Sequence, residues 1–152
     1  MNFGVPAGID QFLETTRDVI QLAKASSIEF KHTHITPEHL LLGLLKQQGG
    51  EAARVLERAQ ASPEQIRDLI LHHLRPGDDS IPEHLIGFSE RAKRVIEAAR
   101  QEAQRLRAPQ VGPEHLLLGL TLVPNTVSGA VLRAVGLTTE IVRAALGSRP
   151  DA

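Results

Sequence analysis

The chain contains no cysteine, no tryptophan and no tyrosine, and its 152 residues include only four phenylalanines. The lack of cysteine excludes disulfides, thiolate catalysis and zinc sites with sulfur ligands, and it is consistent with a reducing compartment. The lack of tryptophan and tyrosine removes the side chains that most often stack on nucleic-acid bases or anchor protein interfaces. A partner surface on this protein must therefore rely on leucine, isoleucine, arginine and carboxylate side chains.

The sequence also lacks a strong net charge and long apolar runs. Its formal net charge is -1, without the basic excess that is typical of nucleic-acid-binding or lipid-binding domains. No apolar run approaches the roughly 18 residues of a membrane span, and the first residues do not resemble a secretory signal or a transit peptide. We therefore expect a cytoplasmic protein with no membrane partner. A hydrophobic content of 41% with 23% charged residues is typical of a globular protein.

The most prominent feature of the sequence is an internal repeat. The stretch TPEHLLLGL at residues 36–44 returns as GPEHLLLGL at residues 112–120. We call the displacement from position 36 to position 112 the repeat offset. The same offset aligns Phe12 with Phe88 and Val55-Leu56 with Val131-Leu132 without a gap. The chain is therefore a tandem duplication, which must be recognised before any fold is assigned.

Turn-forming residues mark the join between the two copies. The segment RPGDDS at residues 75–80 combines proline, glycine and aspartate, which favour a connection over a helix. A third PEHL, at residues 82–85, is out of register with the repeat and lacks the leucine run, so we interpret it as part of the linker. The predicted units are repeat 1 at residues 9–73, a linker at 74–87 and repeat 2 at 88–147, together forming one compact pseudo-dimeric domain.

Each repeat predicts four helices. A long helix begins at residue 88 of repeat 2, where apolar residues recur every three, four or seven positions and Ser89 can cap the first turn. The motif helix follows, with proline at its first position and leucines on all sides, which predicts that the other helices enclose it. The third helix ends near Gly136 in repeat 2, and the fourth begins with the capping box SPEQ at residue 62 in repeat 1. We predict an all-α protein with eight helices in two repeats related by a pseudo-twofold axis.

Two copies of the motif (T/G)PEHLLLGL, one in each repeat, with FSERAKRV opening the second copy, resemble the N-terminal repeat domain of the ClpA, ClpB and ClpC chaperone ATPases. The likeness covers roughly residues 9–147 and has features of both the ClpC and the ClpB branch. It implies a module that binds substrates or adaptors of a Clp machine. The sequence contains no GxxxxGK[ST] phosphate loop, so we expect no ATPase activity, no enzyme and no cofactor. The chain is then either a stand-alone adaptor or regulator, or part of a larger chaperone.

The resemblance points to Glu38 and Glu114 as binding residues, with Thr36 and Gly112 beside them. ClpC-type relatives use this glutamate to bind the guanidinium group of phosphoarginine, and a helix N-terminus can hold the phosphate. Relatives usually have threonine where this chain has Pro37 and Pro113, and each proline removes a hydroxyl group and an N–H. The alternative is that each glutamate only complements the dipole of its own helix. The partner is then a Clp ATPase, an adaptor, or an unfolded or arginine-phosphorylated substrate.

The remaining candidates have simpler interpretations. We interpret His39 and His115, like Pro37 and Pro113, as structural residues of the motif helices, because each histidine can bond its own first turn. His32, His34 and His39 could imitate a metal cluster, but repeat 2 has no histidine at the first two positions, and we expect no metal site.

The basic stripe at residues 89–107 offers a second functional hypothesis, a helical nucleic-acid-binding regulator. Interspersed glutamates favour a salt-bridged surface there instead.

Overall fold

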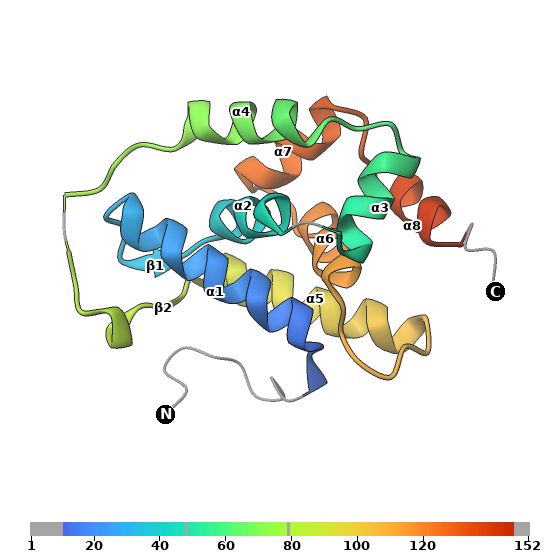
Figure 1. The fold of residues 1–152 in the computed structure, drawn as a ribbon, viewed down its shortest axis with the longest axis horizontal. Coiled ribbons are helices and arrows are strands. Elements are labelled where there is room, and N and C mark those ends of the chain that lie inside the picture. The colour runs from blue at the N-terminus through green and yellow to red at the C-terminus, as the bar shows by residue number, and fades with distance from the viewer. Residues whose placement is uncertain (1–10, 48, 79, 148–152) are drawn as a thin grey trace.

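The computed structural model describes residues 11–47, 49–78 and 80–147. Eight α-helices lie in this part of the chain, and they confirm the predicted all-α repeat (Figure 1). They are α1 (Glu14–Glu29), α2 (Pro37–Lys46), α3 (Glu51–Arg58), α4 (Pro63–His73), α5 (Glu90–Arg105), α6 (Pro113–Leu122), α7 (Val127–Ala134) and α8 (Thr139–Gly147). The linker holds a short 3-10 helix, η2 (Glu83–Leu85), where the third PEHL lies.

Local sequence signals set several helix ends. The Ser89 hydroxyl accepts a hydrogen bond from the Ala92 backbone N–H at 3.1 Å, and Ser62 accepts one from the Gln65 N–H at 3.1 Å. Both serines occupy the N-cap and satisfy a backbone donor that has no partner within the helix. Gly136 follows α7 with φ of 86°, a left-handed conformation that glycine adopts without steric cost. These three termini were predicted from sequence and are confirmed.

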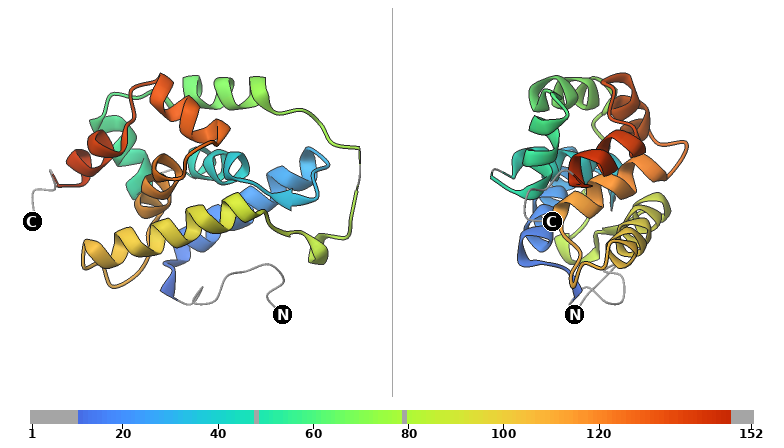
Figure 2. Two further views of the ribbon diagram at one scale, coloured as in Figure 1. Left: turned by 180° about the vertical axis from the view of Figure 1, so that it is seen from behind. Right: turned by 90° about the vertical axis from the view of Figure 1, so that its right-hand side faces the viewer.

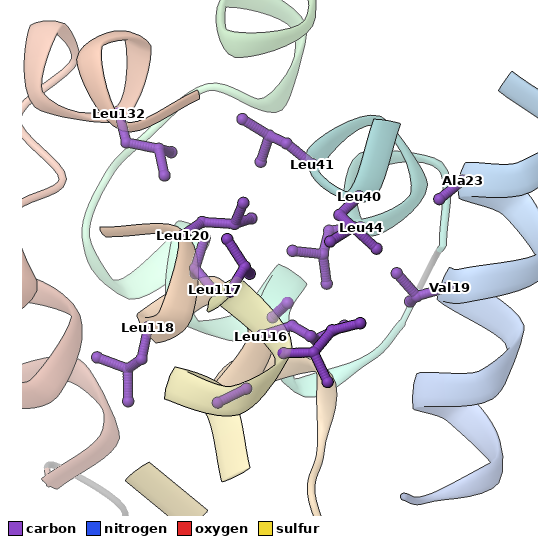
Figure 3. Close-up of a cluster of buried hydrophobic side chains, with 14 of the residues drawn as sticks. Val19, Ala23, Leu40, Leu41, Leu44, Leu116, Leu117, Leu118, Leu120 and Leu132 are labelled. Atoms are coloured by element: carbon purple, nitrogen blue, oxygen red, sulfur yellow. The ribbon is translucent and has the colours of Figure 1, made fainter. Parts of the chain in front are cut away.

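The two motif helices form the centre of the protein. Figures 1 and 2 show α2 and α6 between the long helices α1 and α5 on one side and the four short helices on the other. Their leucine side chains meet in one core (Figure 3). The buried leucines of these two helices are Leu40, Leu41, Leu42, Leu44, Leu116, Leu117, Leu118 and Leu120. A helix that is apolar on all sides must be enclosed, and both motif helices are, as the sequence predicted.

A glycine in each motif helix allows the close approach of the long helix. A Cβ atom on Gly43 would lie 2.5 Å from the carbonyl oxygen of Val19 in α1. Gly119 packs against Val95 of α5 in the same way. Only the absence of a side chain permits this backbone contact, which explains why both copies of the motif contain glycine at this position.

Two short strand pairings tie the repeats together. Strand β1 (His34–Ile35) precedes α2 and pairs in parallel with β2 (Gly87–Phe88), which precedes α5 of the other repeat. The reciprocal pairing is a parallel bridge between Phe12 and Val111. The repeat offset relates these two positions to Phe88 and Ile35. Each motif helix is therefore anchored at its start by the other repeat, which supports a single domain with pseudo-twofold symmetry.

No single helix in the described ranges is both long and apolar enough to cross a membrane. Helices α6 and α7 reach that length and composition only as a pair bent by 97°.

Candidate functional site

The carboxylate of Glu38 crosses from repeat 1 to repeat 2. It lies in the first turn of α2, and its Oε2 atom accepts hydrogen bonds from both the backbone N–H and the hydroxyl group of Ser128, each at 3.1 Å. Ser128 is the second residue of α7, so Glu38 places its negative charge at the positive end of a helix in the other repeat. Both bonds use Oε2, and neither engages Oε1.

A pocket of about 460 Å³ opens beside this carboxylate. It is lined by the start of α2, the start of α5 and the turn before α7. The lining residues are Thr36, Pro37, Glu38, Ser89, Glu90, Arg91, Arg94, Asn125, Thr126 and Val127. Within the described part of the chain, neither Arg91 nor Arg94 forms an ion pair. The pocket thus combines the carboxylate of Glu38, which Ser128 holds in place, with the carboxylate of Glu90, which pairs with Lys93, and with two guanidinium groups. We call it the Glu38 pocket.

The second motif glutamate has different surroundings. Glu114 is buried, with 6% of its surface exposed. Its carboxylate folds back over Gly112, where a Cβ atom would collide with it, and its Oε2 lies 3.9 Å from Nε2 of His115. Glu114 lines a separate cavity of about 540 Å³ together with Arg107 and Arg143.

The repeat offset explains why the two glutamates differ. The positions in repeat 1 that correspond to Ser89, Glu90, Arg91 and Arg94 are Leu13, Glu14, Thr15 and Asp18. The start of α1 therefore offers no cation where α5 offers two, and the arginines beside Glu114 come from other parts of the chain. The sequence placed Arg91 and Arg94 in a basic stripe but gave no sign that they lie next to Glu38.

The motif histidines bond the starts of their own helices. Nδ1 of His39 accepts the Thr36 N–H at 2.9 Å, and Nδ1 of His115 accepts the Gly112 N–H at 2.8 Å. Burial, with a smaller contribution from the nearby His32, lowers the pKa of His39 to about 4. His39 is therefore neutral at physiological pH.

Two other candidates from the sequence are the histidine cluster and the basic stripe at residues 89–107. No group of three or more histidine, aspartate or glutamate side chains suited to a metal ion occurs among the described residues. On α5, three of the basic residues pair with glutamates three positions earlier along the helix. These pairs are Lys93 with Glu90, Arg100 with Glu97 and Arg105 with Glu102. Half of the stripe is thus part of a salt-bridged surface.

Comparison with known proteins identifies the repeat. The family model of the Clp repeat N-terminal domain matches residues 11–85 and again residues 87–149. The chain belongs to the Clp repeat N-terminal domain family. This domain is a non-catalytic module, distinct from the ATPase motor.

Relatives in both chaperone branches are about equally similar. The chain is 32% identical over 133 residues to the negative regulator of genetic competence ClpC/MecB of Bacillus subtilis, covering 88% of this chain and 16% of that protein. It is 31% identical over 133 residues to the chaperone ClpB of Oceanobacillus iheyensis, with the same coverage of 88% and 16%. The chain thus spans about one sixth of the length of these relatives.

Solved structures agree on the fold. The N-terminal domain of the chaperone ClpD from Arabidopsis thaliana superposes with a TM-score of 0.69 at 22% identity, over 93% of this chain and 98% of that one. At this level of identity, the likeness concerns the fold alone.

Proposed function

We propose that this Clp repeat domain is a protein-binding module that recognises substrates or adaptors of a Clp machine, and that the Glu38 pocket is its contact site. The observation that carries the proposal is the combination of a carboxylate and two guanidinium groups in one pocket. A phosphoarginine side chain has the matching pattern, because its guanidinium group is a planar donor and its phosphate is an anion.

The arrangement of charges supports a proposed role for each group. Oε1 of Glu38 would accept from the ligand guanidinium group while Oε2 stays on Ser128. Arg91 and Arg94 would hold the phosphate, and the absence of an N–H on Pro37 then matters less because the anion has two cationic partners. Thr36 lines the same pocket. Glu114 and Gly112 remain a second predicted contact, buried and without equivalent cations on α1.

Isothermal titration of phosphoarginine, and of arginine, into the purified protein tests this assignment. We expect phosphoarginine to bind, and Glu38→Ala to weaken that binding by at least tenfold, because a charge-assisted hydrogen bond contributes about 1.5 to 3 kcal/mol. Arg91→Ala/Arg94→Ala should remove the preference for phosphoarginine over arginine. Glu97→Ala is the matched control, since this exposed carboxylate of α5 pairs with Arg100 and does not line the pocket.

Two results would count against the proposal. Binding that survives Glu38→Ala but is lost in Glu114→Ala would move the site to repeat 2. The absence of any binding by either compound would leave the family assignment intact but exclude the Glu38 pocket as a reader of modified arginine.

A further inference from the structure

A small apolar groove lies between α4 and α7 on the surface of the protein. Figure 1 shows these two helices side by side, away from the long helices. The groove has a volume of about 280 Å³, and five of its six lining residues are apolar. The six lining residues are Leu69, His73, Val127, Ala130, Val131 and Ala134, of which only His73 is polar. A volume of this size accommodates one leucine or phenylalanine side chain.

The corresponding place in the other half of the molecule is bridged by the chain itself. There α3 packs beside α8, and the repeat offset puts Arg54 and Arg58 where α7 has Ala130 and Ala134. Arg58 reaches across to α8 and donates from Nη1 to the carbonyl oxygen of Ala145 at 3.1 Å. Two alanines in α7 leave the equivalent position without such a bridge.

The groove adjoins the Glu38 pocket. Val127, the first residue of α7, lines both of them. With a rise of about 1.5 Å per residue, Ala130 and Ala134 lie roughly 4 and 10 Å further along the helix. An extended peptide advances about 3.3 Å per residue, so side chains two to four positions apart span this distance.

We propose that the groove between α4 and α7 binds an apolar side chain of the same peptide whose arginine or phosphoarginine side chain enters the Glu38 pocket. This inference rests on the proposed function and adds the class of peptide that is recognised. The charge pattern of the pocket selects the basic or phosphorylated residue, and the groove selects an apolar residue two to four positions away. The occupant is thus an extended segment of a partner protein.

Three ten-residue glycine-serine peptides test the proposal by NMR titration of the 15N-labelled, full 152-residue protein. One carries phosphoarginine and leucine three positions apart, one carries phosphoarginine alone and one carries leucine alone. We expect the first to bind about tenfold more tightly than the second, since burying most of a leucine side chain contributes on that scale. The amide signals of Ala130 and Ala134 should shift only when leucine is present.

The variant Ala134→Arg fills the groove with the residue that α3 has at this position. Ala134 is exposed and lies two turns from the Glu38 pocket, so neither folding nor the charge at the pocket should be disturbed. We expect the variant to remove the tenfold gain and to leave binding of the phosphoarginine-only peptide unchanged. Arg58→Ala on α3 is the matched control and should retain the gain.

The possible failures are distinguishable. Equal affinity of the two phosphoarginine peptides would overturn the groove assignment and leave the proposed function intact, whereas no binding of any peptide would overturn both. A dimer in sedimentation velocity that Ala134→Arg converts to a monomer would identify the groove as a contact between two copies of this chain, which also excludes the proposed occupant.

Discussion

Nε2 of His39 lies 2.9 Å from Nδ1 of His32 and donates its proton to it. The direction follows from both ends of the chain of hydrogen bonds, since His39 Nδ1 must accept from the Thr36 N–H and His32 Nε2 must donate to the Arg75 carbonyl oxygen at 2.6 Å. An added proton on either ring would place two donors face to face. This pair connects the start of α2 to the linker between the repeats.

The histidine pair predicts a loss of stability in mild acid. Because the pKa of His39 falls to about 4 in the folded protein, from about 6.5 in an unfolded chain, the unfolded state binds more protons between these values. The free energy of unfolding should therefore decrease as the pH falls from 6.5 to 4, by at most on the order of 3 kcal/mol from this group. Urea denaturation across this pH range measures the slope.

The matched variants for this prediction are His39→Gln and His34→Gln. His39→Gln should make the free energy of unfolding less dependent on pH. The difference in this free energy between the variant and wild type should therefore become smaller toward pH 4. His34 is exposed and its Nδ1 atom hydrogen-bonds to the hydroxyl group of Thr33 in the same loop, so His34→Gln should follow wild type. If the free energy of unfolding changed with pH in the same way for wild type and His39→Gln, the pH dependence could not be assigned to His39.

The close helix contacts predict that Gly43→Ala and Gly119→Ala each lower the free energy of unfolding by about 1 to 3 kcal/mol. The added methyl group meets the backbone of α1 or α5, which cannot move aside without opening the core. Gly147→Ala is the control, because nothing lies within 4 Å of a Cβ atom there. Thermal denaturation of the three variants checks this expectation. If Gly43→Ala and Gly119→Ala were as stable as Gly147→Ala, the helices would be able to move apart at little cost in free energy.

The buried carboxylate of Glu102 predicts that α8 depends on an ion pair with α5. Arg143 of α8 donates to Glu102 from Nη2 at 2.9 Å, and Arg105 donates at 2.9 Å. Burial alone raises the pKa of Glu102, but the hydrogen bonds and charges of Arg105 and Arg143 outweigh it and lower the pKa below its usual value.

Replacement of Glu102 by glutamine should destabilise the protein by about 1 to 2 kcal/mol at pH 7, since both arginines can turn to solvent when their partner is lost. A carboxylate with a lowered pKa stabilises the fold above its unfolded pKa and loses this effect as pH falls through its folded pKa. The difference between wild type and Glu102→Gln should therefore shrink in acid. A difference that stays constant down to pH 3 would exclude the ion pair as its source.

The contact between Glu38 and Ser128 predicts coupling between the two repeats. Single substitutions Glu38→Ala and Ser128→Ala, combined in a double-mutant cycle, should give an interaction energy of about 1 kcal/mol in urea denaturation. This energy measures the bond from the Ser128 hydroxyl group, because Ser128→Ala keeps the backbone N–H that also donates to Glu38. Glu90→Ala with Ser128→Ala is the control pair, because Glu90 pairs with Lys93 instead. Additive effects of the two substitutions would mean that the bond from the Ser128 hydroxyl group to Glu38 contributes nothing to stability in solution.

Much of the fold could be predicted because its determinants are local or periodic. The duplication, the serine caps and the enclosed leucine helices all follow from residues a few positions apart or from the repeat offset. Even the difference between Arg58 in α3 and Ala134 in α7 is visible once the repeats are aligned. The consequence of this difference for a surface groove is not visible in the alignment, because it depends on which helices become neighbours.

The sequence by itself determined that this protein is a helical tandem repeat, because hydrophobic period and capping residues act within single helices. The motif (T/G)PEHLLLGL in each copy carried the resemblance to the Clp N-terminal domain. Only the tertiary structure decided that Glu38 meets Ser128, 90 positions away, and that Arg91 and Arg94 line the same pocket. These contacts arise where the two repeats pack together. Their geometry depends on the angle and separation of whole helices, which no spacing along the chain encodes.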